Sequence, residues 1–246
     1  MTGEINNFTV LESVYGRFLV NRHAVAQADA LVKTGRTHFE PELQKILAIV
    51  RTLPKEAIAV DAGANIGMVA VPLAHTLHGS GGMVLAFEAQ RMLAYAMCGT
   101  AALNDLDNLH VYQQALGAET GWVNVPRPDY GVAQDFGLLS LVGSDPEAPG
   151  EHVRTTSIDA LELPRLDFLK IDVEGMELDV LKGGDKAIRA HQPWCWIEYW
   201  KVGMEPIKAA FAGLPYRFFR MNELDLLCAP AARLEESKLK ISAPET

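Results

Sequence analysis

The chain has 246 residues, of which 49% are apolar and 22% charged, and its formal net charge is −9. This composition is typical of a soluble globular enzyme, and it disfavours electrostatic binding to nucleic acid. It also excludes a membrane-spanning helix, because no apolar run approaches the ~20 residues such a helix needs. The three separated cysteines and the absence of a secretory signal in MTGEINNFTV favour a cytoplasmic protein with reduced core thiols, and neither a disulfide framework nor a zinc site.

The first 50 residues are interpreted as an N-terminal cap. An alternating segment at residues 8–20 precedes an expected helix at residues 24–33. A second helix is expected at residues 41–53, where Leu43, Ile46, Leu47 and Val50 share one face.

From residue 56 onward, buried strands alternate with helices. Strands are expected at residues 57–62, 83–88 and 109–115, and helices at residues 66–78 and 91–104. This alternation predicts parallel βαβ units with right-handed crossovers, and therefore a doubly wound α/β fold. Residues 117–150 interrupt the alternation with many Gly, Pro, Asp and Ser residues and one expected hairpin near residues 122–125. A long insertion of this kind is usually functional or mobile.

The alternation resumes after the insertion. Strands are expected at residues 166–172, 194–200, 216–221 and 225–228, and helices at residues 177–190 and 205–212. We therefore divide the chain into a cap (1–50), an α/β domain (51–230) and a C-terminal tail (231–246).

A glycine turn of sequence VDAGANIG joins the first strand of the α/β domain to its helix. Gly63 allows a tight turn and the approach of a ligand, and Gly67 permits close packing of the helix on the strand. Asp61 places a negative charge beside this turn, which would repel a pyrophosphate and attract the ammonium group of a methionine moiety. Glu88 ends the next strand, 21 residues after Gly67, where an acid can accept both hydroxyls of a ribose.

These residues favour S-adenosylmethionine as the ligand. The alternative is a nicotinamide dinucleotide, whose fingerprint is Gly-x-Gly-x-x-Gly. Asn65 occupies the second glycine position of that fingerprint, and the acid before the turn is unfavourable for phosphates. The structural alternative is that the strand-ending Asp61 only caps the next helix.

A second acidic segment, of sequence FLKIDVEG, ends a buried strand. Asp172 and Glu174 would point the same way if the extended conformation persisted. They could then act as a general base or hold a divalent cation, of which the cation is the less favoured. Alternatively, Asp172 positions the cofactor or the backbone, and Glu174 caps the following helix. Lys170 could tune Asp172, although pairing with a surface acid is the commoner role of a strand lysine.

In this order the motifs resemble the FkbM-type methyltransferases over roughly residues 39–200. The matching segments are VDAGANIG, AFE ending at Glu88, Leu103-Asn104, TSIDAL, KIDVEG with Glu177, and Ile197-Glu198. The resemblance implies a class I methyltransferase fold, with a Rossmann-like, mostly parallel seven-stranded sheet. It also implies methyl transfer from S-adenosylmethionine to an oxygen, often a hydroxyl of a sugar or a secondary metabolite. Ala89-Gln90 departs from the family, which usually has proline after the ribose-binding acid.

Asp172 is the first candidate for the general base that a hydroxyl acceptor needs, followed by Glu174 or Glu198. Asp172 is also a candidate cofactor contact. Glu40 could contact the methionine end of the cofactor from the cap, or it could serve only as a helix-terminal charge. Trp200 is expected to face the pocket, and Trp196 to pack in the core.

The acceptor is expected to be a small molecule or a glycan, with neither nucleic acid nor a metal assigned to the site. Two alternative functions stay open at this point. One is a nicotinamide-dependent oxidoreductase, and the other is a domain that binds S-adenosylmethionine without catalysis.

Overall fold

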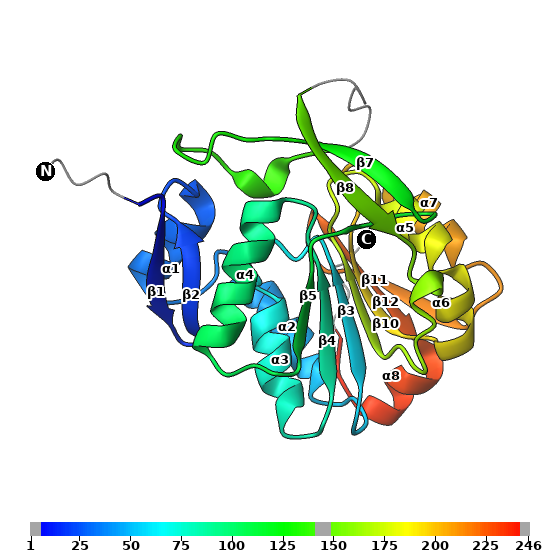
Figure 1. Cartoon of the computed structure of the whole chain (residues 1–246). Helices are drawn as coiled ribbons and strands as arrows, with labels where there is room; N and C mark the ends of the chain where they lie inside the picture. Colours follow the sequence, from blue (N-terminus) through cyan, green and yellow to red (C-terminus); the bar gives the residue numbers. More distant parts are fainter. Residues whose placement is uncertain (1–5, 141–148, 242–246) are drawn as a thin grey trace, which may run out of the picture.

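A seven-stranded sheet forms the centre of the computed structural model, which describes residues 6–140 and 149–241 (Figure 1). The strand order is β11-β12-β10-β9-β3-β4-β5. Strands β10, β9, β3, β4 and β5 run parallel, whereas β12 is antiparallel to both of its neighbours. The strands are β3 (Ile58–Ala62), β4 (Met83–Phe87), β5 (Leu109–Tyr112), β9 (Phe168–Ile171), β10 (Trp194–Glu198), β11 (Tyr216–Arg220) and β12 (Asp225–Pro230). The prediction of a doubly wound, mostly parallel seven-stranded sheet is confirmed.

Helices cover both faces of this sheet (Figure 1). One face carries α2 (Glu40–Val50), α3 (Ala70–His78) and α4 (Arg91–Leu103), and the other carries α5 (Glu177–Gly183), α6 (Asp185–His191) and α7 (Met204–Ala210). Alternate residues of the central strands pack on opposite faces of the sheet. Ala59 belongs to the hydrophobic core formed with α2, α3 and α4, and Val60 to the core formed with α5, α6 and α7. Because side chains alternate along a strand, a strand covered on both faces must be apolar throughout.

The N-terminal segment forms a hairpin and one helix at the edge of the domain. The hairpin pairs β1 (Phe8–Ser13) with β2 (Gly16–Asn21), and helix α1 spans Val25–Thr34. Strand β2 packs against α4, and Ala24 forms an isolated bridge with Gln134 of the insertion. The expected helix at residues 24–33 is therefore confirmed within one residue.

Two expected helices are shorter in the structure. The helix expected from residue 66 begins only at Ala70, because residues 63–69 form a turn in which Asn65 and Gly67 have φ angles of 53° and 90°. The helix expected at residues 177–190 is divided into α5 and α6 at Gly184. The two consecutive glycines at this division, Gly183 and Gly184, are weak helix formers.

The insertion contributes one strand, β7, to a second, three-stranded sheet. Strand β8 (Gly150–Thr156) pairs with β7 (Gly121–Pro126) and with β6 (Ala115–Leu116). The expected strand near residues 122–125 is present, but its partner follows after a long connection and not after a tight hairpin turn. Residues 141–148 of this connection lie outside the described residues. A helical turn, Phe136–Leu138, is held by a hydrogen bond from Gln90 Nε2 to the Phe136 carbonyl.

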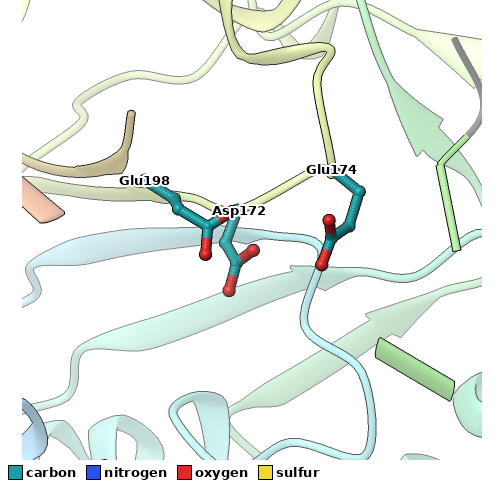
Figure 2. A group of neighbouring side chains, drawn as sticks. All are labelled: Asp172, Glu174 and Glu198. Atoms are coloured by element: carbon teal, nitrogen blue, oxygen red, sulfur yellow. The ribbon is translucent and has the colours of Figure 1, made fainter. Parts of the chain in front are cut away.

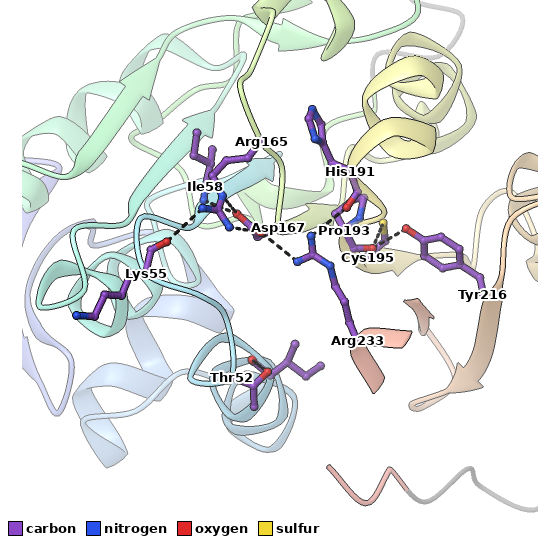
Figure 3. A network of polar contacts seen from close by, with 11 residues as sticks. Thr52, Lys55, Ile58, Arg165, Asp167, His191, Pro193, Cys195, Tyr216 and Arg233 are labelled. Carbon is purple, nitrogen blue, oxygen red and sulfur yellow. Dashed lines mark hydrogen bonds and ion pairs between the residues drawn. The ribbon is translucent and has the colours of Figure 1, made fainter. Parts of the chain in front are cut away.

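Asp167 organises a polar network at the end of the sheet where the parallel strands begin (Figure 3). It accepts hydrogen bonds from the Ile58 backbone N–H, from Arg165 and from Arg233 of helix α8 (Ala231–Ser237). Burial alone would raise the pKa of Asp167, but these donors outweigh it and lower the pKa below its ordinary value. The network therefore fastens the C-terminal helix to the sheet. Among the described residues, no helix combines the length and the apolar character needed to cross a membrane.

Candidate active site

A cavity of about 480 Å³ opens where the parallel strands end. Its walls come from the glycine turn, from the ends of β4, β9 and β10, from the N-terminal segment and from the insertion. Ligands of open α/β sheets bind at this edge, and the volume is within the usual range for small-molecule sites. The predicted site residues that line it are Gly63, Asn65, Glu88, Asp172, Glu174 and Glu198.

The glycine turn is fastened directly to the second acidic segment. Gly63 has a φ angle of 78°, and a Cβ atom there would lie 1.8 Å from the backbone oxygen of Asp172. Only glycine fits this approach, so the two motifs are held in register at the cavity floor. Gly67 does not line the cavity. A Cβ at Gly67 would lie 3.1 Å from Met97 and from Val71, which assigns this glycine to the packing of α3 on α4.

Glu88 is only 7% exposed and is fixed by two backbone donors. Its Oε2 accepts a hydrogen bond from the Asn65 N–H at 2.8 Å, and its Oε1 accepts one from the Gln90 N–H at 2.7 Å. Burial raises the pKa of Glu88 to about 7 and the Asp61 charge adds to this shift, although the two backbone hydrogen bonds oppose it. Each oxygen keeps a lone pair, so the carboxylate can still accept hydroxyl groups from a ligand in the cavity.

Asp61 lies beneath the turn and does not line the cavity. The Nζ atom of Lys170 lies 3.4 Å from Asp61 Oδ1 and 3.1 Å from Asp172 Oδ2. Burial would lower the pKa of Lys170, but the charges of Asp172 and Asp61 outweigh it, so the ammonium group is retained. The expected pairing of Lys170 with a surface acid is therefore wrong. The charge of Asp61 therefore acts on the Lys170 ammonium, and its contact with the cofactor stays a prediction.

Three carboxylates converge at the ends of β9 and β10 (Figure 2). One oxygen from each of Asp172, Glu174 and Glu198 lies within 4.8 Å of the other two. Glu174 has a φ angle of 58°, so the chain leaves the extended conformation here, and a left-handed turn brings its side chain toward Asp172. Sequence reasoning found these acids but not this geometry.

The charges of this cluster shift its proton affinities. Burial raises the pKa of Glu198 to about 8, with added repulsion from Asp172 and Glu174. Glu198 Oε2 also accepts a hydrogen bond from Trp200 Nε1 at 2.9 Å. Glu174 forms an ion pair with Lys201, a residue that sequence reasoning missed and that lies three positions after the end of β10. Ammonium groups therefore already bind two of the three acids, Lys170 on Asp172 and Lys201 on Glu174.

Glu40 does not reach the cavity. Its Oε1 accepts hydrogen bonds from the Tyr15 hydroxyl and from Arg36, both at 2.6 Å. The Glu40 carboxylate is held by these two donors, and its contact with the methionine end of the cofactor stays a prediction. Glu42, two residues further along α2, lines the cavity and accepts a hydrogen bond from Asn222.

One of the two tryptophans lies as expected and the other does not. Trp196 is 2% exposed and packs in the core, as expected, and it also contributes to the cavity lining. Trp200, expected to face the pocket, is not part of the lining, and its ring is half-exposed beneath the Lys201 ammonium. Further lining residues that sequence reasoning missed come from separate parts of the chain: Gln27, His38, Asp135 and Asp225. No motif marks them, because only the folded chain brings them to this edge.

Comparison with known proteins gives a family match within the α/β domain. Residues 61–218 match the model of the methyltransferase FkbM domain. No curated protein sequence matches. The fold resembles that of the methyltransferase FkbM from Methylobacillus flagellatus KT, with a TM-score of 0.52 and 18% identity over 85% of this chain. This chain spans only 55% of that protein's length.

Two further solved structures are more distant. TYW2 of M. jannaschii, in complex with AdoMet, has a TM-score of 0.45 and 13% identity, with 91% of this chain and 84% of that protein covered. A SAM-dependent methyltransferase from Aquifex aeolicus has a TM-score of 0.43 and 12% identity, with 76% and 87% covered.

Proposed function

Because the chain belongs to the FkbM methyltransferase family, we propose that it methylates an oxygen atom, namely a hydroxyl of a sugar or a secondary metabolite. Family membership supports S-adenosylmethionine-dependent methyltransferase activity and argues against the nicotinamide-dependent oxidoreductase. The observation that carries the proposed chemistry is the convergence of Asp172, Glu174 and Glu198 in the cavity, directly beside the glycine turn.

The lining of the cavity fits the methyl donor. Glu88 presents a fixed carboxylate that can accept the ribose hydroxyls, and Gly63 of the turn lines the same cavity. The Oδ1 atom of Asn65 is buried and has no hydrogen-bond partner among the described residues, as expected of a side chain that serves a ligand. When bound, S-adenosylmethionine supplies an electrophilic methyl group on a positively charged sulfur.

Glu198 is the better supported general base. A base is most effective when its pKa lies near the working pH, and Glu198 has a pKa of about 8. Asp172 Oδ2 instead accepts a hydrogen bond from the Lys170 ammonium at 3.1 Å, so this oxygen already has a partner. We assign Asp172 the role of orienting the acceptor hydroxyl toward the methyl group, because alignment of the two reacting atoms supplies much of the rate. Glu174, paired with Lys201, sets the local charge.

A screen with labelled methyl donor tests this function. The purified protein is incubated with labelled S-adenosylmethionine and with sugars, glycolipids and small hydroxylated metabolites, with Mg²⁺ or with a chelator. The expected product carries the label on an oxygen. It should form as well in the presence of the chelator as in the presence of Mg²⁺. Label found only on an amine or a carboxylate would contradict hydroxyl methylation while leaving the methyltransferase assignment intact.

The ribose contact predicts a loss of cofactor affinity in Glu88→Gln. A glutamine amide turns one N–H donor toward the backbone N–H of Asn65 or of Gln90, and it lacks the charge that strengthens hydrogen bonds to hydroxyls. A hydrogen bond to a charged group contributes about 1.5–3 kcal/mol, so we expect affinity for S-adenosylhomocysteine to fall about 10-fold or more. Isothermal titration calorimetry measures this, with the exposed Glu119→Gln as the control. Equal affinities in the two variants would remove Glu88 from the ribose site.

A further inference from the structure

A segment of the insertion, residues 130–140, forms one wall of the cavity, and we call it the strap. Its members in the lining are Asp135, Gly137, Leu138 and Leu139. In Figure 1 the helical turn of the strap lies on the side of the sheet at which the parallel strands end. The strap therefore lies at the edge where ligands of this fold bind.

The strap is fastened to segments that face the ligand. A Cβ atom built on Gly137 would lie 2.9 Å from Asn65 Nδ2, so the middle of the strap packs closely against the glycine turn. At the far end, Ser140 Oγ donates a hydrogen bond to the Glu174 carbonyl at 2.7 Å. The strap thus extends from the cofactor motifs to the carboxylate cluster.

Gln90 anchors the strap beside the ribose acid. Its side chain is 6% exposed and bonds the strap at two points. Nε2 donates to the Phe136 carbonyl at 2.6 Å, and Oε1 accepts a hydrogen bond from the Tyr130 hydroxyl at 3.4 Å. The backbone N–H of Gln90 donates to Glu88 Oε1 at 2.7 Å. One residue therefore holds the ribose acid with its main chain and the strap with its side chain.

The bond to Phe136 stabilises the closed position of the strap. Phe136 is 3% exposed, and its ring lies 5.1 Å from that of Tyr130, measured between centroids. A buried carbonyl that loses its donor costs free energy. Loss of the Gln90 amide would therefore favour an open strap. Backbone hydrogen bonds of Gln134 with His23 and Val25 fasten the strap to the cap, so the chain should still fold.

We propose that Gln90 is a positioning residue that holds the strap closed over the ribose end of the methyl donor and thereby slows the release of the cofactor. Glu88 is the ribose contact, and the residue that fixes its Oε1 atom also fixes the strap. The inference rests on the cofactor assignment of the proposed function and not on the identity of the acceptor.

Gln90→Met tests the proposal, because methionine keeps the length of the side chain and removes both of its hydrogen bonds to the strap. Release of S-adenosylhomocysteine requires the strap to open, so we expect dissociation to become about 10-fold faster, with no fall in the association rate. Surface plasmon resonance on the immobilised protein measures both rates. Gln44→Met is the matched control, since Gln44 bonds Tyr15 and Glu40 outside the cavity, and its rates should be those of the unchanged protein.

Hydrogen exchange distinguishes an anchored strap from a direct contact between Gln90 and the ligand. In the unchanged protein, S-adenosylhomocysteine should slow amide exchange in both the strap and the glycine turn. In Gln90→Met it should slow exchange in the glycine turn alone. Faster dissociation with a strap that stays protected would assign Gln90 to the ligand itself, and an unchanged dissociation rate would remove its control of release. Either result overturns the proposal.

A second variant, Ser140→Ala, releases the strap at its far end and does not depend on the folding of Gln90→Met. Ser140 is not part of the cavity lining, so a direct ligand contact is not what the substitution removes. We expect faster dissociation here as well, and an unchanged rate contradicts a strap that is fastened at both ends. If the unchanged protein binds no S-adenosylhomocysteine, the cofactor assignment fails and the proposal with it. Binding with equal rates in all variants removes the strap alone.

Discussion

Methyl transfer falls about 10²–10⁴-fold in Glu198→Gln, which is the contribution expected of a general base. The amide keeps the size of the side chain, and it can still accept the hydrogen bond from Trp200 Nε1. It cannot take up the proton that the acceptor hydroxyl loses. Turnover is measured with the acceptor found in the labelled screen, and the affinity for S-adenosylhomocysteine should stay within about threefold of the unchanged protein. The control is Glu205→Gln, an exposed acid paired with Lys208 on α7.

The pH profile distinguishes Glu198 from Asp172 as the base. Only the carboxylate form accepts a proton, so the rate should rise with pH through about 8, the raised pKa of Glu198, and then level off. This apparent pKa belongs to the cluster, because Asp172 and Glu174 contribute to it. Glu198→Gln should abolish the inflection, whereas Asp172→Asn should lower the rate and move the inflection to lower pH, because the charge of Asp172 contributes to the raised pKa of Glu198. If the inflection disappears in Asp172→Asn and persists in Glu198→Gln, the two roles must be exchanged.

The free energy of unfolding falls by about 3 kcal/mol in Asp167→Ala. The side chain is 1% exposed, and its loss leaves Arg165, Arg233 and the Ile58 N–H without their acceptor (Figure 3). Removing one partner of a buried ion pair costs about 3–5 kcal/mol. We take the lower end of this range, because water still reaches about a third of Arg165 and of Arg233. Urea denaturation monitored by circular dichroism measures the change.

The matched control is Asp185→Ala, which breaks an exposed helical ion pair with Arg189 and should cost no more than about 0.5 kcal/mol. Equal losses in the two variants would show that the Asp167 network stabilises the fold no more than an exposed ion pair does. The pH dependence has a fixed sign, because the pKa of Asp167 is lowered in the folded state. Its contribution is fully present above the unfolded pKa of about 4, and it is lost as the pH falls through the native value.

Local sequence determined most of the sheet and the location of the site. The central strands are apolar along their whole length, because helices cover both faces, and such runs can be recognised without a structure. Gly63 and Glu88 could be placed for the same reason: each follows a recognisable strand, and parallel strands deliver their ends to one edge. The glycine turn shortened α3, because local φ angles overrode the apolar periodicity that continues into residues 66–69.

Only the tertiary structure decided how these residues work together. Lys170 joins Asp61 to Asp172 because β3 and β9 are neighbours in the sheet, a pairing between strands more than a hundred residues apart. Gln27 of the cap and Gly137 of the insertion are also more than a hundred residues apart in the sequence, and the fold brings both to one wall of the cavity. Charge and hydrogen bonding act through space, so the pKa of Glu198 depends on neighbours that no local motif specifies. The sequence by itself therefore determined the fold class and the motifs of the cofactor site, whereas long-range packing decided which side chains complete that site.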